Sequence, residues 1–110
     1  MARRYEVFMS KEFKDFLTNF PDPGKAYLDL FKSVMDAPAL DAKTKQLILI
    51  GAMTAQNYPP GVAAHVPQAL KAGANREEIL EAVLTPLPVS GINGVIECLQ
   101  AALKVLDTPD

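Results

Sequence analysis

The chain has 110 residues, 49% of them hydrophobic, and a formal net charge of −2 at pH 7. A chain of this length has room for one domain, which buries roughly 65% of its unfolded surface around a single core. The 11 basic and 13 acidic residues form no basic stripe, which argues against nucleic-acid binding. No apolar run reaches the roughly 18 to 20 residues of a membrane span, so we expect no membrane partner.

The single cysteine, Cys98, cannot form an intramolecular disulfide, which fits a reducing compartment better than secretion. Charged residues follow Met1 before any apolar run of signal-peptide length appears. We therefore expect a cytoplasmic protein. Residues 1–9 are expected to be an N-terminal extension of a helical domain that covers residues 10–110.

Apolar residues at helical spacing predict two helices near the N-terminus. Ser10 suits the cap of the first helix, and the sequence Pro-Asp-Pro-Gly at 21–24 is expected to stop it. The second helix follows and is expected to end near Pro38. The apolar positions of both helices recur every three or four residues: Phe13, Phe16, Leu17, Phe20, Tyr27, Leu30, Phe31, Val34 and Met35.

The middle of the chain predicts two further helices. Asp41 suits the cap of a helix whose run from Leu47 to Ala55 is apolar on all sides, as is typical of an interior helix. A buried strand is the alternative for 47–50, but the run is too long and too rich in alanine to favour it. The next helix is expected from Pro60 to about Ala72, with a bend at Pro67.

The last third predicts two more helices, which makes six. Asn75 and the glutamates after it suit a helix start, and the apolar positions of that helix extend to Leu87. Prolines make the segment 86–91 a stiff connection, after which apolar spacing predicts a helix from Ile92 to Leu106. The predicted fold class is all-α, a single-domain bundle of about six helices.

Three segments in this order carry a family resemblance. They are Leu-Asp-Ala-Lys-Thr-Lys-Gln-Leu-Ile at 40–48, the stretch from His65 through Gln-Ala-Leu-Lys-Ala-Gly-Ala at 68–74, and Asn-Arg-Glu-Glu-Ile-Leu-Glu-Ala at 75–82. The pattern resembles the carboxymuconolactone decarboxylase superfamily, which includes the alkyl hydroperoxide reductase D-type (AhpD-like) proteins. The resemblance implies an AhpD-like helical bundle that assembles into trimers or hexamers.

In the peroxidase-like members of that superfamily, a glutamate precedes a Cys-x-x-Cys-x-x-x-His run by twelve positions. The resemblance places the glutamate at Gln46, the two cysteines at Tyr58 and Gly61, and the histidine at His65. Thiol chemistry needs a pair of sulfurs that can cycle through a disulfide, and neither Tyr58 nor Gly61 supplies one. The decarboxylase branch also lacks the cysteine pair, and it implies acid/base chemistry on a lactone carboxylic acid without a cofactor.

His65 is the candidate catalytic residue, because it is the only histidine and imidazole exchanges protons near neutral pH. Its alternative is a hydrogen-bonded core residue. Gln46 could orient a ligand or His65, or be an ordinary exposed glutamine. Tyr58 could donate a hydrogen bond to a substrate or only cap a loop, and Gly61 could leave a small cavity or relieve crowding. Cys98 is expected to pack as a small apolar group in the core.

The primary functional hypothesis is cofactor-free acid/base chemistry on a small organic acid or lactone, with His65 as acid/base and Gln46, Tyr58 and Gly61 in the substrate pocket. No metal or other cofactor is expected. The alternative is a catalytically inactive oligomeric relative that binds a small ligand or a protein. A third hypothesis, an alkylhydroperoxidase, lacks the thiol pair that it needs. The apolar surface of the predicted helices indicates self-association.

Overall fold

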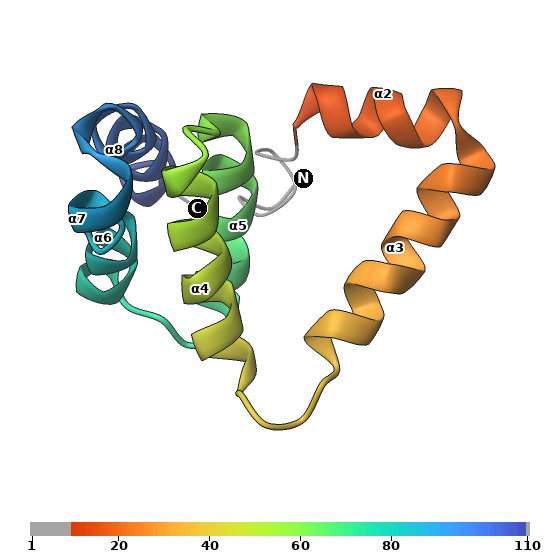
Figure 1. Ribbon diagram of the computed structural model, residues 1–110, viewed down its shortest axis with the longest axis horizontal. Coiled ribbons are helices and arrows are strands. Elements are labelled where there is room, and N and C mark those ends of the chain that lie inside the picture. Colours follow the sequence, from red (N-terminus) through yellow and green to blue (C-terminus); the bar gives the residue numbers. More distant parts are fainter. Residues whose placement is uncertain (1–9, 110) are drawn as a thin grey trace.

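The computed structural model describes residues 10–109, so the expected extension at residues 1–9 lies outside the described residues. Every regular element in the described part is a helix, which confirms the all-α prediction. The helices form two parts: a bundle made by α4 to α8, and an arm made by α2 and α3 that projects from it (Figure 1). Within residues 10–109, no helix is both long enough and apolar enough to span a membrane.

The bundle consists of α4 (Ala42–Ala55), α5 (Pro59–Lys71), α6 (Arg76–Leu84), the short α7 (Leu87–Ser90) and α8 (Ile92–Leu106). Helix α5 packs against α4 on one side and α8 on the other, and α6 packs against α4 and α8. Small and branched apolar side chains fill the space between these four long helices. The hydrophobic core residues that are exposed by 1% or less are Ile50, Val62, Val66, Ala69, Ile79, Val83, Cys98, Ala102 and Val105.

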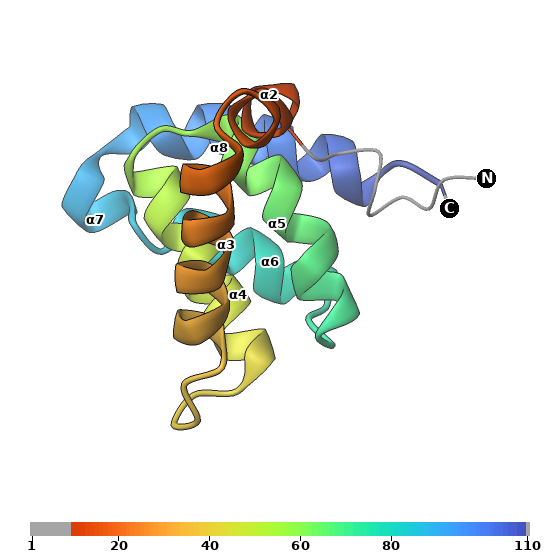
Figure 2. The ribbon, with the colours of Figure 1, turned by 90° about the vertical axis from the view of Figure 1, so that its right-hand side faces the viewer.

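The arm consists of α2 (Lys11–Asn19) and α3 (Pro21–Met35), which pack against each other through aromatic rings. The Tyr27 ring lies edge-on to Phe13 and Phe16, with ring centroids 5.9 and 6.3 Å apart. Gly24 is the only residue of these two helices that is buried. The C-terminal end of α3 lies near the start of α4, and toward its N-terminal end α3 diverges from the bundle, while α2 lies across the top and points back toward the bundle (Figure 1); α2 is seen nearly end-on in Figure 2.

A lysine from the bundle holds the base of the arm. The ammonium group of Lys45, in the first turn of α4, donates hydrogen bonds to the main-chain carbonyl oxygens of Met35 at 2.8 Å, Val34 at 3.2 Å and Ala37. These carbonyls belong to the last turn of α3 and the residues after it, whose oxygens have no partner within the helix. Lys45 therefore fixes the point from which the arm projects.

Two expected boundaries differ from the structure, and proline explains both. The sequence at 21–24 does not form a loop after the first helix, because Pro21 begins α3 and Phe20 alone separates the two helices. Proline suits the first helical position, where its missing N–H would have no partner. The expected helix extending to Leu87 ends at Leu84, and part of the proline-rich connection forms α7. The strand alternative for 47–50 is wrong, because these residues lie within α4.

Helix α8 crosses the end of α4 at Gly94. A methyl group added at Gly94 would overlap the main-chain carbonyl oxygen of Thr54 and would lie 3.5 Å from the Cα of Asn57. The obstacle is backbone and not a movable side chain, so the two helices can approach this closely only with glycine at this position. This crossing brings α8 against the helix that carries Gln46.

Candidate functional site

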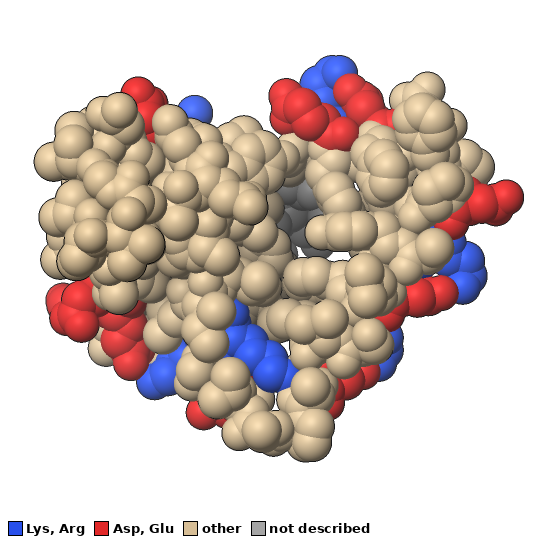
Figure 3. Space-filling model, viewed as in Figure 1, with Lys and Arg blue, Asp and Glu red and all other residues tan. Residues whose placement is uncertain are grey.

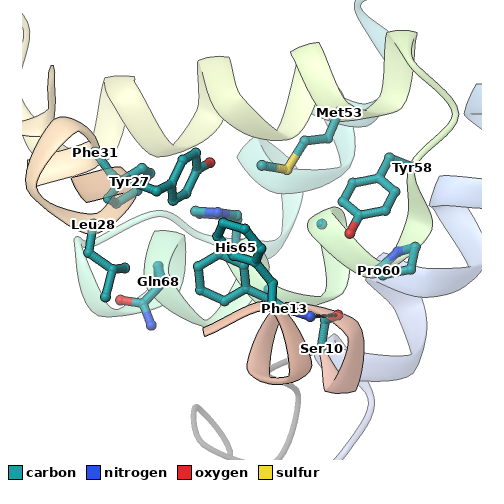
Figure 4. Close-up of a pocket in the computed structure, with 13 residues that line it drawn as sticks. Ser10, Phe13, Tyr27, Leu28, Phe31, Met53, Tyr58, Pro60, His65 and Gln68 are labelled. Carbon is teal, nitrogen blue, oxygen red and sulfur yellow. Dashed lines mark hydrogen bonds between the residues drawn. The ribbon is translucent and has the colours of Figure 1, made fainter. Parts of the chain in front are cut away.

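A pocket with a volume of about 490 Å³ lies between the arm and the bundle. The arm side of the pocket is mostly aromatic, with Ser10, Phe13, Phe16, Tyr27, Leu28 and Phe31. The bundle side comes from the end of α4 and the first three turns of α5, with Met53, Tyr58, Pro60, Gly61, Ala64, His65 and Gln68. Figure 4 shows His65 between the aromatic rings of the arm and the side chains of Met53 and Tyr58.

His65 is paired with Gln46 across the contact between α5 and α4. The Nδ1 atom of His65 lies 2.9 Å from the Oε1 atom of Gln46. A carbonyl oxygen can only accept a hydrogen bond, so Nδ1 of the imidazole donates and carries the proton. The other ring nitrogen, Nε2, then holds the free lone pair. Gln46 is only 8% exposed, so it is not an ordinary surface glutamine and its amide is held in place by the packing around it.

The second ring nitrogen of His65, Nε2, makes no hydrogen bond with any residue from 10 to 109. His65 itself lines the pocket. The ring of Phe31 lies beside the imidazole, with centroids 5.9 Å apart and an angle of 46° between the planes. Gln46 and Phe31 therefore hold the imidazole, and among the described residues Nε2 has no partner.

Burial lowers the pKa of His65 below its ordinary value of 6.5, because desolvation disfavours the charged imidazolium. The imidazole is consequently neutral at pH 7, with a lone pair that can accept a proton. Among the described residues, no lysine, arginine, aspartate or glutamate lines the pocket. On the face seen in Figure 3, the described side chains next to the hollow are uncharged, and most of the charged ones lie farther from it.

Tyr58 and Gly61 both line the pocket, and the Tyr58 ring fills the space that a side chain at position 61 would need. Tyr58 precedes Pro59 as the N-cap residue of α5. A Cβ atom on Gly61 would lie 2.6 Å from Cδ2 of the Tyr58 ring and 2.7 Å from the Met53 sulfur. Gly61 therefore leaves no unfilled cavity for a side chain, and it relieves crowding where α5 begins.

The structure thus brings all four predicted residues to one region. His65, Tyr58 and Gly61 line the pocket, and Gln46 reaches it through His65. The sequence pattern did not indicate that the arm lines the pocket, because the spacing of the aromatic residues in α2 and α3 is also typical of helix packing. It also missed Gln68, which lies on the same face of α5 as His65, and treated Met53 only as a core residue.

Cys98 lies outside the pocket, in the core of the bundle, and is fully buried. Desolvation raises the pKa of its thiol, which disfavours the reactive thiolate. Among residues 10–109, no group of three or more histidine, cysteine, aspartate or glutamate side chains is placed to hold a metal ion. The chemistry that this chain's own residues offer is therefore centred on the imidazole of His65.

The fold and the site define a class: an AhpD-like helical bundle in which an imidazole, and no pair of thiols, lines the pocket. The chain belongs to the carboxymuconolactone decarboxylase family, whose family model matches residues 21–104. This match confirms the resemblance seen from residue 40 onward and extends it to include α3.

Two relatives from Paracoccus denitrificans are similar to this chain. The "Uncharacterized 15.0 kDa protein in nqo9-nqo10 intergenic region" is 34% identical over 82 residues, which cover 73% of this chain and 61% of that protein. The "Uncharacterized protein 4 in cox locus" is 40% identical over 58 residues, which cover 53% of this chain and 52% of that protein. The chain thus matches about half to three fifths of the length of these relatives, and neither name states an activity.

Proposed function

We propose that this protein catalyses cofactor-free proton transfer on a small organic acid or lactone, with His65 as the acid/base. The observation that carries the proposal is the hydrogen bond of 2.9 Å between Nδ1 of His65 and Oε1 of Gln46. It assigns the proton to Nδ1 and leaves Nε2 as the basic atom. A base at the wall of a pocket is the arrangement that general base catalysis requires.

The proposed step begins when Nε2 takes a proton from a carbon next to the substrate's carbonyl group. The electron pair of the broken C–H bond stays on the substrate as an enolate, and His65 becomes an imidazolium ion. Oε1 of Gln46 continues to accept the Nδ1 hydrogen bond and stabilises that ion. The imidazolium then returns the proton to another atom of the same substrate, which restores the neutral imidazole. In a carboxy-lyase reaction, the bond to CO₂ would break in place of the C–H bond, its electron pair would form the enolate, and a proton that His65 takes up from water would go to the carbon that has lost CO₂.

Tyr58 and Gln68 are the proposed polar contacts of the substrate, because both line the pocket near His65. The phenol of Tyr58 can donate a hydrogen bond to the carbonyl oxygen on which enolate charge develops. Gly61 contributes by leaving room for the Tyr58 ring. We place this reaction in the cytoplasm, in keeping with the single, buried cysteine.

We further propose that the protein is a homo-oligomer, a trimer or a hexamer. The support is the arm, whose helices bury no side chain and leave large apolar residues such as Leu30 and Val34 more than half exposed. An exposed apolar surface of this kind is typical of a protein interface. The second candidate function, a catalytically inactive oligomer that binds a small ligand or protein, rests on the same surface and needs no proton transfer.

The test is hydrogen–deuterium exchange at carbon in a lactone or keto acid incubated with the protein in D₂O and followed by proton NMR. We expect the wild-type protein to accelerate exchange next to the carbonyl group and His65→Ala to lose that acceleration. General base catalysis is typically worth about 10²- to 10⁴-fold in rate. Val89→Ala, at an exposed site outside the pocket, is the control and should retain the wild-type rate. An unchanged rate in His65→Ala would refute the assignment of the base.

A further inference from the structure

The described residues that line the pocket carry no formal charge. Of these thirteen residues, those with a polar side chain are Ser10, Tyr27, Tyr58, His65 and Gln68. All five are uncharged at pH 7 when the imidazole is neutral. A carboxylate that enters a largely apolar site loses its hydration, and this loss is compensated only where a cation or several N–H donors replace the water. Among residues 10–109, the side chains that line this pocket provide no such cation.

Helix starts could replace a cation, since the free N–H groups of a first helical turn bind anions. Helix α5 starts at the pocket, but Pro59 and Pro60 have no N–H group. The next two amides, those of Gly61 and Val62, both donate to the carbonyl oxygen of Tyr58, at 3.1 and 3.3 Å. This helix start therefore has no free donor for a carboxylate.

Helix α2 also starts at the pocket, and its first turn carries one acidic residue, Glu12, and one basic residue, Lys11. The hydroxyl of Ser10 accepts a hydrogen bond from the amide of Phe13 at 3.1 Å and donates one to the carboxylate of Glu12 at 2.9 Å. Ser10 is thus already engaged on both sides. The ammonium group of Lys11 is paired with the carboxylate of Asp15 at 2.7 Å, so the negative charge of Glu12 is not offset for an anion at this helix start.

His65 also disfavours the binding of a carboxylate in the pocket. Its Nδ1 proton is used in the bond to Gln46, so the atom that faces a ligand is the lone pair of Nε2. A lone pair repels a carboxylate oxygen but accepts a hydrogen bond from a hydroxyl or N–H group, or a proton from an activated carbon. Burial keeps the imidazole uncharged, because it lowers the pKa of His65.

Aromatic rings define the shape of the remaining space. The rings of Phe13, Tyr27 and Phe31 lie on the arm side of His65, and the sulfur of Met53 lies on the bundle side (Figure 4). Aromatic and thioether groups contact flat rings favourably at their faces and edges. The volume of about 490 Å³ is within the roughly 300 to 1,000 Å³ of small-molecule pockets.

From this lining we infer that the pocket binds an uncharged, flat ring compound, a neutral lactone or ester, and discriminates against the corresponding carboxylate. The inference rests on the proposed function and narrows it: of a small organic acid or a lactone, the substrate is the uncharged lactone. A substrate without a carboxylate has no CO₂ to lose. The reaction class is therefore isomerisation by proton transfer and not decarboxylation.

The test compares a coumarin carboxylate with its methyl ester, two flat lactones that differ in charge at pH 7. Because His65 is the only histidine, its ring signals in proton–nitrogen NMR spectra report binding in this pocket without overlap. We expect the ester to shift these signals and to bind at least about tenfold more tightly than the carboxylate, measured as the ratio of the two dissociation constants. Equal or tighter binding of the carboxylate would overturn the inference, as would the absence of binding by both compounds.

A matched pair of variants tests whether the uncharged lining causes the preference for the ester. Gln68→Lys places a cation at the pocket wall, whereas Gln100→Lys makes the same exchange at an exposed position of α8 that does not line the pocket. Gln68→Lys should reduce the preference for the ester at least severalfold, and Gln100→Lys should leave it unchanged. An equal effect of both variants, or no effect of either, would contradict a preference that is set by the charge of the lining.

The outcomes separate this inference from the proposed function, because binding is measured without turnover. If the ester binds preferentially but His65→Ala still accelerates proton exchange, the inference stands and the assigned base is wrong. If His65→Ala loses the exchange but the carboxylate binds as well as the ester, the base stands and the ligand class is wrong.

Discussion

The carbonyl oxygen of Gln46 accepts a hydrogen bond from Nδ1 of His65 at 2.9 Å, across the contact between α4 and α5. This bond selects one of the two neutral forms of the imidazole and directs its basic nitrogen away from α4. An amide in this position holds the ring without adding charge. The resemblance to the peroxidase-like members of the superfamily implies a glutamate at this position, and glutamine in its place removes a charge while it keeps a hydrogen-bond acceptor.

Replacing Gln46 by glutamate should raise the pKa of His65, because a carboxylate next to the ring favours the imidazolium ion. The change is measured by NMR titration of the single histidine in wild type and Gln46→Glu. Gln46→Leu removes the acceptor without adding charge, and it should not raise the pKa. A pKa in Gln46→Glu that is equal to or lower than the wild-type value would mean that the two side chains are not in contact in solution.

The lowered pKa of His65 predicts how stability depends on pH. In the unfolded chain the imidazole takes up a proton as the pH falls through about 6.5, whereas the folded protein resists protonation until a lower pH. The free energy of unfolding should therefore decrease as the pH falls below about 6.5, and this contribution should level off below the pKa of the folded state.

The measurement is the urea midpoint at several values between about pH 7.5 and pH 5. His65→Gln should show a smaller decrease than wild type over this range. The pKa values of Asp41 and Glu78 are also lowered, but their ordinary values, 3.8 and 4.5, lie below the range. A decrease of the same size in His65→Gln would show that another group causes it.

Gly94→Ala should destabilise the protein by about 1 to 3 kcal/mol, the usual cost of inserting a methyl group where there is no space. The added methyl group would overlap the carbonyl oxygen of Thr54, which is part of α4 and cannot rotate away. The free energy of unfolding in urea measures the effect. Ile96→Ala, at a half-exposed position of the same helix, is the control and should cost less. A neutral effect of Gly94→Ala would contradict the close crossing of α8 and α4.

Leu30→Lys should dissociate or weaken the proposed homo-oligomer. Leu30 lies on α3 and is 59% exposed in a single chain, where a charge would be tolerated unless another subunit covers it. Light scattering coupled to size-exclusion chromatography measures the mass of wild type and variant. Ser33→Lys adds the same charge at an exposed polar position of α3 and should keep the wild-type mass. A wild-type protein that is monomeric at micromolar concentration would contradict the proposal directly.

The sequence predicted the helices well, because apolar spacing and caps are local signals. Ser10, Asp41 and Asn75 each accept a hydrogen bond from the amide three residues later, as their positions before apolar runs indicated. A pairing of Gln46 with His65 was one of three alternatives that the sequence left open, and the structure places the two side chains 2.9 Å apart. Local signals failed at Pro21, because the same proline residue can end one helix or begin the next.

The pocket could not be predicted in the same way. The aromatic spacing of α2 and α3 is the same whether the rings pack within the arm or face a cavity, so the pattern does not reveal that Phe13 and Phe31 line the site. Whether these rings face a cavity depends on the angle between the arm and the bundle. Lys45 holds this angle through hydrogen bonds to main-chain carbonyl oxygens eight to eleven residues earlier in the chain. The crowding at Gly61 depends likewise on where the Tyr58 ring packs.

The most direct test of the central claim is the pair of ring nitrogen chemical shifts of His65, measured by NMR at pH 7 on the wild-type protein. We expect a neutral imidazole with a protonated Nδ1 and an unprotonated Nε2, the form that the bond to Gln46 selects. A proton on Nε2, or an imidazolium ion at this pH, would contradict the claim that His65 presents a basic nitrogen to the pocket.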